Sequence, residues 1–360
     1  MQIKRLKIYR YKIPLTDPLN MKGEVLHNRS GLILEMTTDN GLIGLGDCAP
    51  FPNLHTETID DCIKEIRSNR DRIVHKSVPD SVNGVLSQFD DLNCIPSVRF
   101  ALDCALINIV ASNSKIGFSE FINPRHRPEI EVNGLLAGSD DVILAEAKRL
   151  IKTGFSVLKL KVGRRSIAEE IATVRKLQLI LGKTVKLRTD ANRAWSFDQA
   201  VEFAEGISDC NIEYIEEPIA EPERLHELFE RTGLHIAYDE SLYGKSAEEV
   251  KIFSGLRAFV LKPSVLGSVK NTLNFIEFAD RNNIKPVISS AFESGIGLYA
   301  LAGLASCTKS PAAAGLDTYK WFEHDIALKP FSAESGRIDI LEADKSMNSL
   351  NYELVEEIIL

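Results

Sequence analysis

Val157-Leu158-Lys159-Leu160-Lys161-Val162 is the stretch from which the fold of the chain can be inferred. Apolar residues alternate with lysines here, and this period of two is typical of a β-strand. The apolar face demands burial, while the two lysines share the opposite face. A buried lysine is costly unless it is paired, so we expect both lysines to point into a site that uses them. Solvated lysines on an exposed strand are the competing interpretation.

Seven other β-type runs lie along the chain, with helical patterns between them. They recur about every 25 residues, and eight alternating strand–helix units predict an α/β fold of the (β/α)₈-type, the TIM barrel. An open doubly wound sheet is the competing fold, but no Gly-x-Gly-x-x-Gly motif follows any strand. The seven runs are residues 132–136, 185–190, 212–216, 235–239, 258–262, 286–290 and 313–317.

The N-terminal third of the chain has a different pattern, which predicts an α+β capping domain. Two short apolar runs, 31–36 and 41–46, flank the turn residues Thr38-Asp39-Asn40-Gly41, and this arrangement favours a β-hairpin. Helical periodicity follows at 56–66 and again at 97–111. We therefore predict three parts: a capping domain 1–125, a barrel domain 126–325 and a C-terminal segment 326–360 that returns to the cap. A linker near 125–128 connects the first two.

The charge balance limits the classes of molecule that the protein is expected to bind. The formal net charge is −8, which argues against nucleic acid or an anionic membrane as the main partner but leaves room for a small anionic substrate. No run approaches the roughly 18 apolar residues that span a bilayer, and no signal-like core follows the first residues. The six scattered cysteines are expected to be reduced thiols, which favours the cytoplasm. The oligomeric state stays open.

Ionisable residues stand at the ends of five successive predicted strands. In a parallel barrel the carboxyl ends of the strands meet at one mouth, where active sites are built. We therefore expect these five side chains to converge on one site. They are Lys161, Asp190, Glu216, Asp239 and Lys262.

The three carboxylates Asp190, Glu216 and Asp239 predict a metal site. An all-oxygen set of ligands suits Mg²⁺, or Mn²⁺ in its place, rather than zinc, which prefers histidine and cysteine. Each carboxylate taken alone could instead end its strand as a turn former or helix cap. Asn192 and Glu240 are candidates for orienting the ligands, and Arg188, which points inward by the same alternation, is another.

The lysines predict acid–base chemistry on an anionic substrate. Lys159 and Lys161 would lie close to each other and to the metal, which would lower the pKa of at least one toward neutrality. Lys262 lies roughly across the barrel, as a second acid or base or as a fixed positive charge. A plain salt bridge to Asp239 is the alternative. Three lysines and one divalent ion carry +5 and three carboxylates −3, which leaves the mouth with about +2.

These motifs resemble the enolase superfamily, muconate-lactonizing subgroup. The resemblance covers nearly the whole chain and implies metal-stabilised enolate chemistry. The residues that carry it are Lys-x-Lys at 159–161, Asp190-x-Asn192, Glu216-Glu217-Pro218, Asp239-Glu240-Ser241 and Lys262-Pro263. Within the superfamily, the stretches 289–297 and 315–322 are similar to the o-succinylbenzoate synthase family of menaquinone biosynthesis, whose members are hydro-lyases. That family dehydrates 2-succinyl-6-hydroxy-2,4-cyclohexadiene-1-carboxylate to o-succinylbenzoate, by syn elimination.

The resemblance also implies a role for each site residue. Lys161 would abstract the α-proton and return it to the leaving hydroxyl, while Lys262 and the metal held by the three carboxylates stabilise the enediolate. Lys159 would lie beside the substrate carboxylate. Backbone donors near Ser289, Ser290 and Gly295 would meet the succinyl arm, and cap loops near 19–22 and 49–53 would cover the mouth.

Three alternatives stay open. N-succinylamino acid racemisation and dipeptide epimerisation use the same enolate-forming site, although dipeptide epimerases place Asp-x-Asp after the eighth strand, where this chain has Asp317-Thr318-Tyr319. A Schiff-base aldolase would use a barrel lysine as nucleophile but leaves the three carboxylates unexplained. A non-catalytic barrel is the third, and it would bind no metal.

Overall fold

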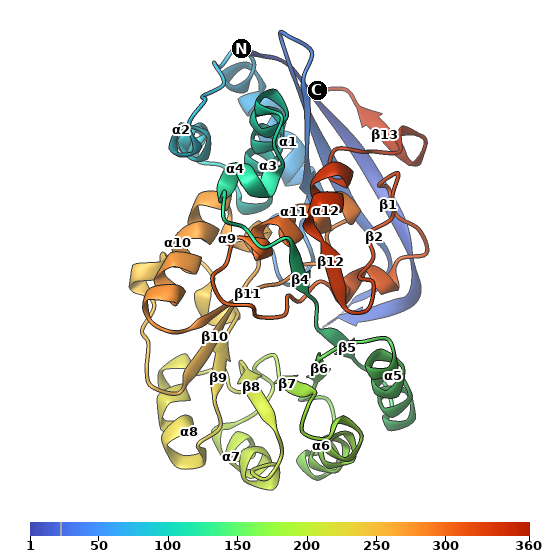
Figure 1. Ribbon diagram of the computed structural model, residues 1–360, viewed down its shortest axis with the longest axis vertical. Coiled ribbons are helices and arrows are strands. Elements are labelled where there is room, and N and C mark those ends of the chain that lie inside the picture. Colours follow the sequence, from blue (N-terminus) through green and yellow to red (C-terminus); the bar gives the residue numbers. More distant parts are fainter. Residues whose placement is uncertain (22–23) are drawn as a thin grey trace.

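The computed structural model describes residues 1–21 and 24–360, and Figure 1 shows them as an N-terminal sheet with helices placed above a barrel. The barrel strands curl into a parallel sheet, and α5 to α8 lie around its outer side. Within the described residues, no helix combines the length and the apolar character needed to cross a membrane.

The capping part is built on a four-stranded antiparallel sheet with the order β13-β1-β2-β3. The predicted hairpin is confirmed: Leu34 of β2 pairs with Gly46 of β3 across the turn. Thr58 begins α1 with a reciprocal capping box to Asp61, which satisfies free amides at the helix start. The elements are β1 (Ile3–Met21), β2 (Glu24–Thr38), β3 (Ile43–Cys48), α1 (Ile59–Ile73), α2 (Val82–Ser87), η1 (Asp90–Leu92), α3 (Pro96–Ser114) and α4 (Phe118–Ile122).

Helix α3 is the central support of the cap. Its residues from Ser97 to Ala111 are all buried, so the helix is covered on every side rather than on one face. It packs so closely on β3 that a Cβ at Gly44 would lie 2.0 Å from the Ala105 carbonyl oxygen, and a Cβ at Gly46 1.9 Å from that of Ala101. Only glycine permits this approach of helix to strand.

The barrel sheet has seven regular parallel strands in the order β11-β10-β9-β8-β7-β6-β5. Capping boxes begin two of the covering helices: Ser166 pairs with Glu169 in α6, and Ser196 with Gln199 in α7. The elements are β5 (Gly134–Leu136), α5 (Asp140–Lys152), β6 (Val157–Lys161), α6 (Ile167–Leu181), β7 (Lys186–Asp190), α7 (Phe197–Gly206), β8 (Ile212–Glu216), η2 (Pro222–Arg224), α8 (Leu225–Thr232), β9 (Ile236–Tyr238), η3 (Glu240–Leu242), η4 (Ala247–Glu249), β10 (Leu256–Leu261), α9 (Pro263–Leu266), α10 (Val269–Arg281), β11 (Lys285–Ile288) and α11 (Gly295–Ser306).

The eighth predicted strand is present as two isolated parallel bridges rather than a regular strand. Ala314 bridges Val132, and Gly315 bridges Ser289. The Asn133 amide donates to the Ala314 carbonyl at 2.9 Å, while the Gly315 amide donates to the Ile288 carbonyl at 2.8 Å. The segment thus joins both ends of the seven-stranded sheet, so the sheet closes into the predicted barrel and the open doubly wound alternative is wrong.

Arg188 fills the barrel interior, where it is 1% exposed. Its guanidinium donates to Glu213 at 2.7 Å, to the Asn133 side chain at 3.1 Å and to the Ala313 carbonyl at 2.8 Å. It contacts none of the three predicted metal ligands. The prediction that Arg188 orients those ligands is therefore wrong; the side chain ties β7 and β8 to the closing segment instead.

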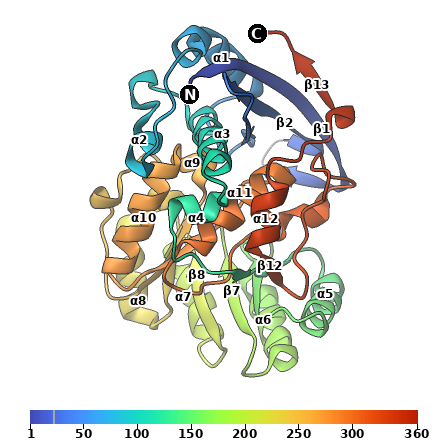
Figure 2. The ribbon, with the colours of Figure 1, turned by 45° about the horizontal axis from the view of Figure 1, so that its top comes forward.

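The C-terminal part of the chain packs on earlier elements. Strand β12 (Arg337–Asp339) pairs antiparallel with β4 (Glu129–Glu131), which lies at the start of the barrel domain. After β12 the chain forms α12 (Ile340–Ser346), η6 (Tyr352–Leu354) and β13 (Val355–Ile358). Strand β13 pairs with β1, and Figure 2 shows the two side by side. The exact domain boundaries stay a prediction.

We predict that Arg188→Met destabilises the fold by about 1–3 kcal/mol, because it removes the bonds of the guanidinium to Asn133 and Ala313 and leaves the buried Glu213 carboxylate with Lys285 as its close partner. Lys186→Met is the matched control: Lys186 lies on the same strand and 4.0 Å from Glu213, but its side chain is 55% exposed. Urea unfolding followed by circular dichroism measures both. Equal loss in the two variants would contradict the role given to Arg188.

Candidate active site

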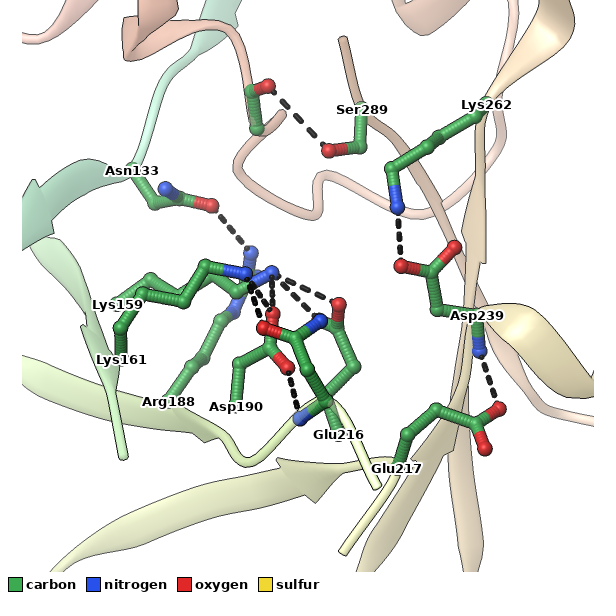
Figure 3. Close-up of polar contacts among 12 residues, drawn as sticks. Asn133, Lys159, Lys161, Arg188, Asp190, Glu216, Glu217, Asp239, Lys262 and Ser289 are labelled. Atoms are coloured by element: carbon green, nitrogen blue, oxygen red, sulfur yellow. Dashed lines mark hydrogen bonds and ion pairs between the residues drawn. The ribbon is translucent and has the colours of Figure 1, made fainter. Parts of the chain in front are cut away.

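The strand register brings the predicted strand-end residues to one level of the barrel. Lys161 of β6 is the register partner of Asp190 of β7, and Asp190 is the partner of Glu216 of β8. Asp239 follows β9 directly and Lys262 follows β10. Figure 3 shows these side chains pointing toward one another from successive strands. The three carboxylates are all fully buried.

Lys159 and Lys161 point to the same side, as the alternation predicted, and both pair with carboxylates. The Lys159 ammonium lies 2.8 Å from Asp190 and 2.7 Å from Glu216. The Lys161 ammonium lies 2.6 Å from Asp190 and donates to the Asn192 side-chain oxygen at 2.9 Å. Asp190 is thus shared by the two lysines, which keeps both ammonium groups at one point of the mouth.

Asn192 and Glu240 lie where the sequence predicted, beside the carboxylates. The Asn192 amide donates to Asp190 at 3.0 Å through the backbone and to Glu240 at 3.2 Å through the side chain. The second oxygen of Glu240 is buried and has no hydrogen-bond partner among the described residues. Burial raises the pKa of Glu240, and the charge of Asp239 adds to this effect.

Lys262 forms an ion pair with Asp239, and a residue that the sequence reasoning missed completes this group. The Tyr243 hydroxyl donates to the other oxygen of Asp239 at 2.7 Å and accepts from the Lys262 ammonium at 3.2 Å. Tyr243 lies two residues beyond the Asp239-Glu240-Ser241 motif. The signal that could have found it is its position directly after the short helix Glu240–Leu242, which overlaps this motif.

Glu217 is a second missed residue, although it belongs to a quoted motif. It is fully buried and accepts from the backbone amides of Asp239 at 2.9 Å and Ser241 at 2.7 Å. Its other oxygen accepts from Arg193 at 2.8 Å. Glu217 and Arg193 both have positive φ, 39° and 60°, so the loops after β7 and β8 hold strained backbone that fixes the direction of the Asp239 segment.

The buried carboxylates determine the charge of two of the lysines, Lys159 and Lys262. Burial alone lowers the pKa of Lys159, but the charges of Asp190 and Glu216 outweigh it and the net pKa is raised. The same balance with Asp239 raises the pKa of Lys262. Burial raises the pKa of Asp190, yet the two lysines bring it well below its usual value. The carboxylates therefore hold Lys159 and Lys262 in the charged form.

The donor set fits a hard divalent cation. Three buried carboxylates at neighbouring strand ends offer oxygen ligands only, which is the chemistry that Mg²⁺ and Mn²⁺ prefer. Within the described residues, the side chains as placed form no group of three or more acidic, histidine or cysteine residues that could hold a metal ion. Lysine ammonium groups lie between these carboxylates and balance their charge.

The three predicted substrate donors near the seventh strand are placed differently from one another. The backbone amide of Ser289 donates to Leu261 at 2.8 Å and extends the pairing of β11 with β10. The amide of Ser290 donates to Gly315 at 3.0 Å and serves barrel closure. The Gly295 amide donates to Asp325 at 2.9 Å. These three amides thus bond within the fold, and the role of Ser289, Ser290 and Gly295 in binding a substrate arm stays a prediction. The Ser289 hydroxyl, which Figure 3 shows near the site, donates to the Gly315 carbonyl at 3.4 Å.

One of the two predicted cap loops is held against the barrel by a buried arginine. Arg29 of β2 is 3% exposed and donates to the carbonyls of Ala49, Pro50 and Phe292. The Phe51 ring stacks on Phe292 with centroids 5.0 Å apart. The loop 49–53 thus lies on the segment that follows β11. Of the other predicted loop, 19–22, Lys22 and the side chains of Asn20 and Met21 lie outside the described residues.

Comparisons with known proteins agree with this architecture. The family model "Enolase C-terminal domain-like" matches residues 142–344, and "MenC, N-terminal domain" matches residues 3–109. The chain belongs to the enolase superfamily. It is an enzyme with the superfamily's TIM-barrel fold, and the resemblance inferred from the strand-end motifs is confirmed.

Individual relatives place the chain near two kinds of enzyme. The o-succinylbenzoate synthase of Aliivibrio salmonicida is 30% identical over 90% of this chain and 93% of its own length. Arabidopsis thaliana "Protein PHYLLO, chloroplastic" is 29% identical over 99% of this chain, which spans 24% of that longer protein. Among solved structures, the dipeptide epimerase of Cytophaga hutchinsonii complexed with Mg and D-Ala-L-Val has a TM-score of 0.87 at 24% identity, over 99% of each chain.

The cap loop gives a pH-dependent prediction through His55. Its Nδ1 accepts from the Phe51 amide at 3.0 Å, and burial lowers the pKa of His55 to about 4, against the opposing charge of Glu57. The unfolded chain binds this proton near pH 6.5 and the folded chain only near 4. The stability that a neutral His55 contributes is therefore complete above about pH 6.5 and is lost as the pH falls toward 4.

We expect His55→Gln to flatten this pH dependence. Thermal unfolding midpoints of wild type and variant, measured between pH 7 and pH 4, should differ most at neutral pH and converge as the pH falls. His226→Gln is the matched control, since His226 lies on the exposed surface of α8 with a 52% exposed side chain. Parallel curves for wild type and His55→Gln would show that His55 is not the group that titrates.

Proposed function

We propose that this chain is an o-succinylbenzoate synthase that dehydrates 2-succinyl-6-hydroxy-2,4-cyclohexadiene-1-carboxylate in menaquinone biosynthesis. The observation that carries the proposal is the facing arrangement of Lys161 on β6 and Lys262 beyond β10, with buried carboxylates between them. The relatives at about 30% identity support the same reaction. The product is aromatic, so the elimination is downhill and the enzyme has only to lower the barrier of proton removal.

Lys161 is the proposed base. Its neutral amine takes the α-proton of the substrate, which breaks the C–H bond and leaves the electron pair as an enediolate. The protonated Lys161 then gives the same proton to the hydroxyl on the same face, the C–O bond breaks and water leaves. Asn192, which bonds the Lys161 ammonium at 2.9 Å, holds the amine toward the mouth.

Lys262 and Lys159 are the proposed electrostatic partners. The Lys262 ammonium, held by Asp239 and Tyr243, lies opposite the base and attracts the negative charge that develops on the enediolate. The Lys159 ammonium adds a second positive charge beside the substrate carboxylate. Asp190, Glu216 and Asp239 would hold a Mg²⁺ ion, which supplies positive charge for the same carboxylate.

Asp317 favours dehydration over dipeptide epimerisation, the activity named for several of the similar solved structures. A dipeptide epimerase would need a free carboxylate after the eighth strand for the substrate ammonium. Asp317 is 3% exposed and accepts from the Leu135 amide at 2.8 Å and lies 2.7 Å from the Lys320 ammonium. Its charge is already balanced, and Tyr319 stands where the second aspartate of such a pair would be.

We predict that Lys161→Ala lowers kcat of the dehydration by about 10²–10⁴-fold, the range expected for loss of a positioned general base. The assay follows the absorbance of o-succinylbenzoate with Mg²⁺ present, and EDTA should abolish turnover in the wild type. Lys176→Ala is the matched control, because Lys176 is a 54% exposed lysine on α6 whose one ion-pair partner among the described residues is Asp140.

The opposite result has a defined meaning. A metal-loaded wild type that does not turn over this substrate would contradict the synthase assignment, but not the assignment of the barrel to enolate-forming chemistry. N-succinylamino acid racemisation is then the second candidate, because lysines on opposite sides of the barrel suit proton transfer between two faces of one carbon. Exchange of the α-proton in D₂O, followed by NMR, would reveal it.

A further inference from the structure

Tyr243 occupies a defined place beside the proposed catalytic groups. It is the residue that ends the 3₁₀-helix η3, and its backbone amide donates to the Glu240 carbonyl at 3.3 Å. This turn sends the tyrosine side chain back toward the end of β9, where the phenol meets Asp239. The side chain is partly buried and its ring lies 5.8 Å from the Lys262 ammonium.

We propose that Tyr243 is a positioning residue that holds Asp239 in the orientation required of a metal ligand and Lys262 in that required of an electrostatic partner. The inference rests on the proposed function for the role of Lys262, but not for the role of Asp239. A single phenol does both because it uses its donor on the carboxylate and its acceptor on the ammonium.

The hydrogen bonds of Asp239 leave little freedom to this carboxylate. One oxygen accepts from Tyr243 at 2.7 Å, the other pairs with Lys262, and the Asp239 backbone amide donates to Glu217 at 2.9 Å. The phenol therefore takes up one oxygen and directs the other toward the mouth. Without the phenol, the first oxygen would be buried without a partner, and the carboxylate could rotate to share both oxygens with Lys262.

The hydroxyl of Tyr243 also fixes where the lysine lies. A tyrosine hydroxyl has one proton to donate, and here it goes to Asp239, so the oxygen faces Lys262 as an acceptor. Among the described residues, the 3.2 Å contact is then one of two hydrogen bonds that restrain the Lys262 ammonium, and the other is to Asp239 itself. Partners that hydrogen-bond to ligating carboxylates typically change metal affinity or activity by about 10–100-fold when removed.

The test is Tyr243→Phe, which removes one oxygen atom and keeps the ring. Tyr238→Phe is the matched control, because Tyr238 is a buried tyrosine at the end of β9 whose hydroxyl has no hydrogen-bond partner among the described residues. Isothermal titration of each apoprotein with MgCl₂, without substrate, should show about 10–100-fold weaker binding in Tyr243→Phe and wild-type binding in Tyr238→Phe. Circular dichroism and the thermal midpoint check that both variants fold.

Kinetics separate the two parts of the inference. At saturating Mg²⁺, kcat should fall about 10-fold or more in Tyr243→Phe while KM changes little, since the phenol touches Lys262 rather than the substrate. Wild-type Mg²⁺ affinity in Tyr243→Phe, or a wild type that binds no Mg²⁺, would overturn the inference. Failure of the proposed function alone would appear differently, as absence of turnover in wild-type protein whose Mg²⁺ binding still depends on Tyr243.

Discussion

Charge compensation at the ends of the barrel strands is the constraint on which this structure depends. Asp190, Glu216 and Asp239 are fully buried, and a buried carboxylate without a counter-charge costs several kcal/mol. Lys159 and Lys161 share Asp190, and Lys262 pairs with Asp239, so cations from two opposite sides of the barrel balance one patch of negative charge. The geometry that a catalytic site needs is thus also the geometry that makes these charges tolerable inside the fold.

At the junction between cap and barrel, backbone carbonyl groups stabilise a buried charge. Arg29 has no carboxylate at ion-pair distance among the described residues; it donates to carbonyl oxygens of both parts instead. On the same face, Asp47 accepts from Tyr11 of the cap and from the amide and hydroxyl of Ser294 at the start of α11. Burial raises the pKa of Asp47 to about 6. Buried polar groups therefore fasten the cap over the mouth, where they also exclude water.

Much of the fold and the centre of the site could be predicted from the sequence because period-two alternation and strand-end position are local signals. Lys161, Asp190 and Glu216 follow from such signals, and the register places them side by side. Tyr243 and Arg188 could not be assigned in this way, since their roles depend on which side chains meet across the barrel. The partners of the Ser289, Ser290 and Gly295 amides, which are Leu261, Gly315 and Asp325, could not be read from any local pattern, and the substrate role of these residues stays a prediction.

The eighth segment differs from the other seven in how it pairs with its neighbours. Strands β6 to β10, which carry the charged residues, belong to a continuous ladder, whereas two isolated bridges at Ala314 and Gly315 form a seam between β11 and β5. Backbone hydrogen bonds hold both sides of this seam: Ala314 bonds Glu131 and Asn133, and Gly315 bonds Ile288 and Ser290. The loops at 289–297 and 315–322 flank this seam, so evolution can remodel them while the charged strand ends stay in register. Members of one superfamily can in this way exchange substrates without rebuilding the groups that move the proton.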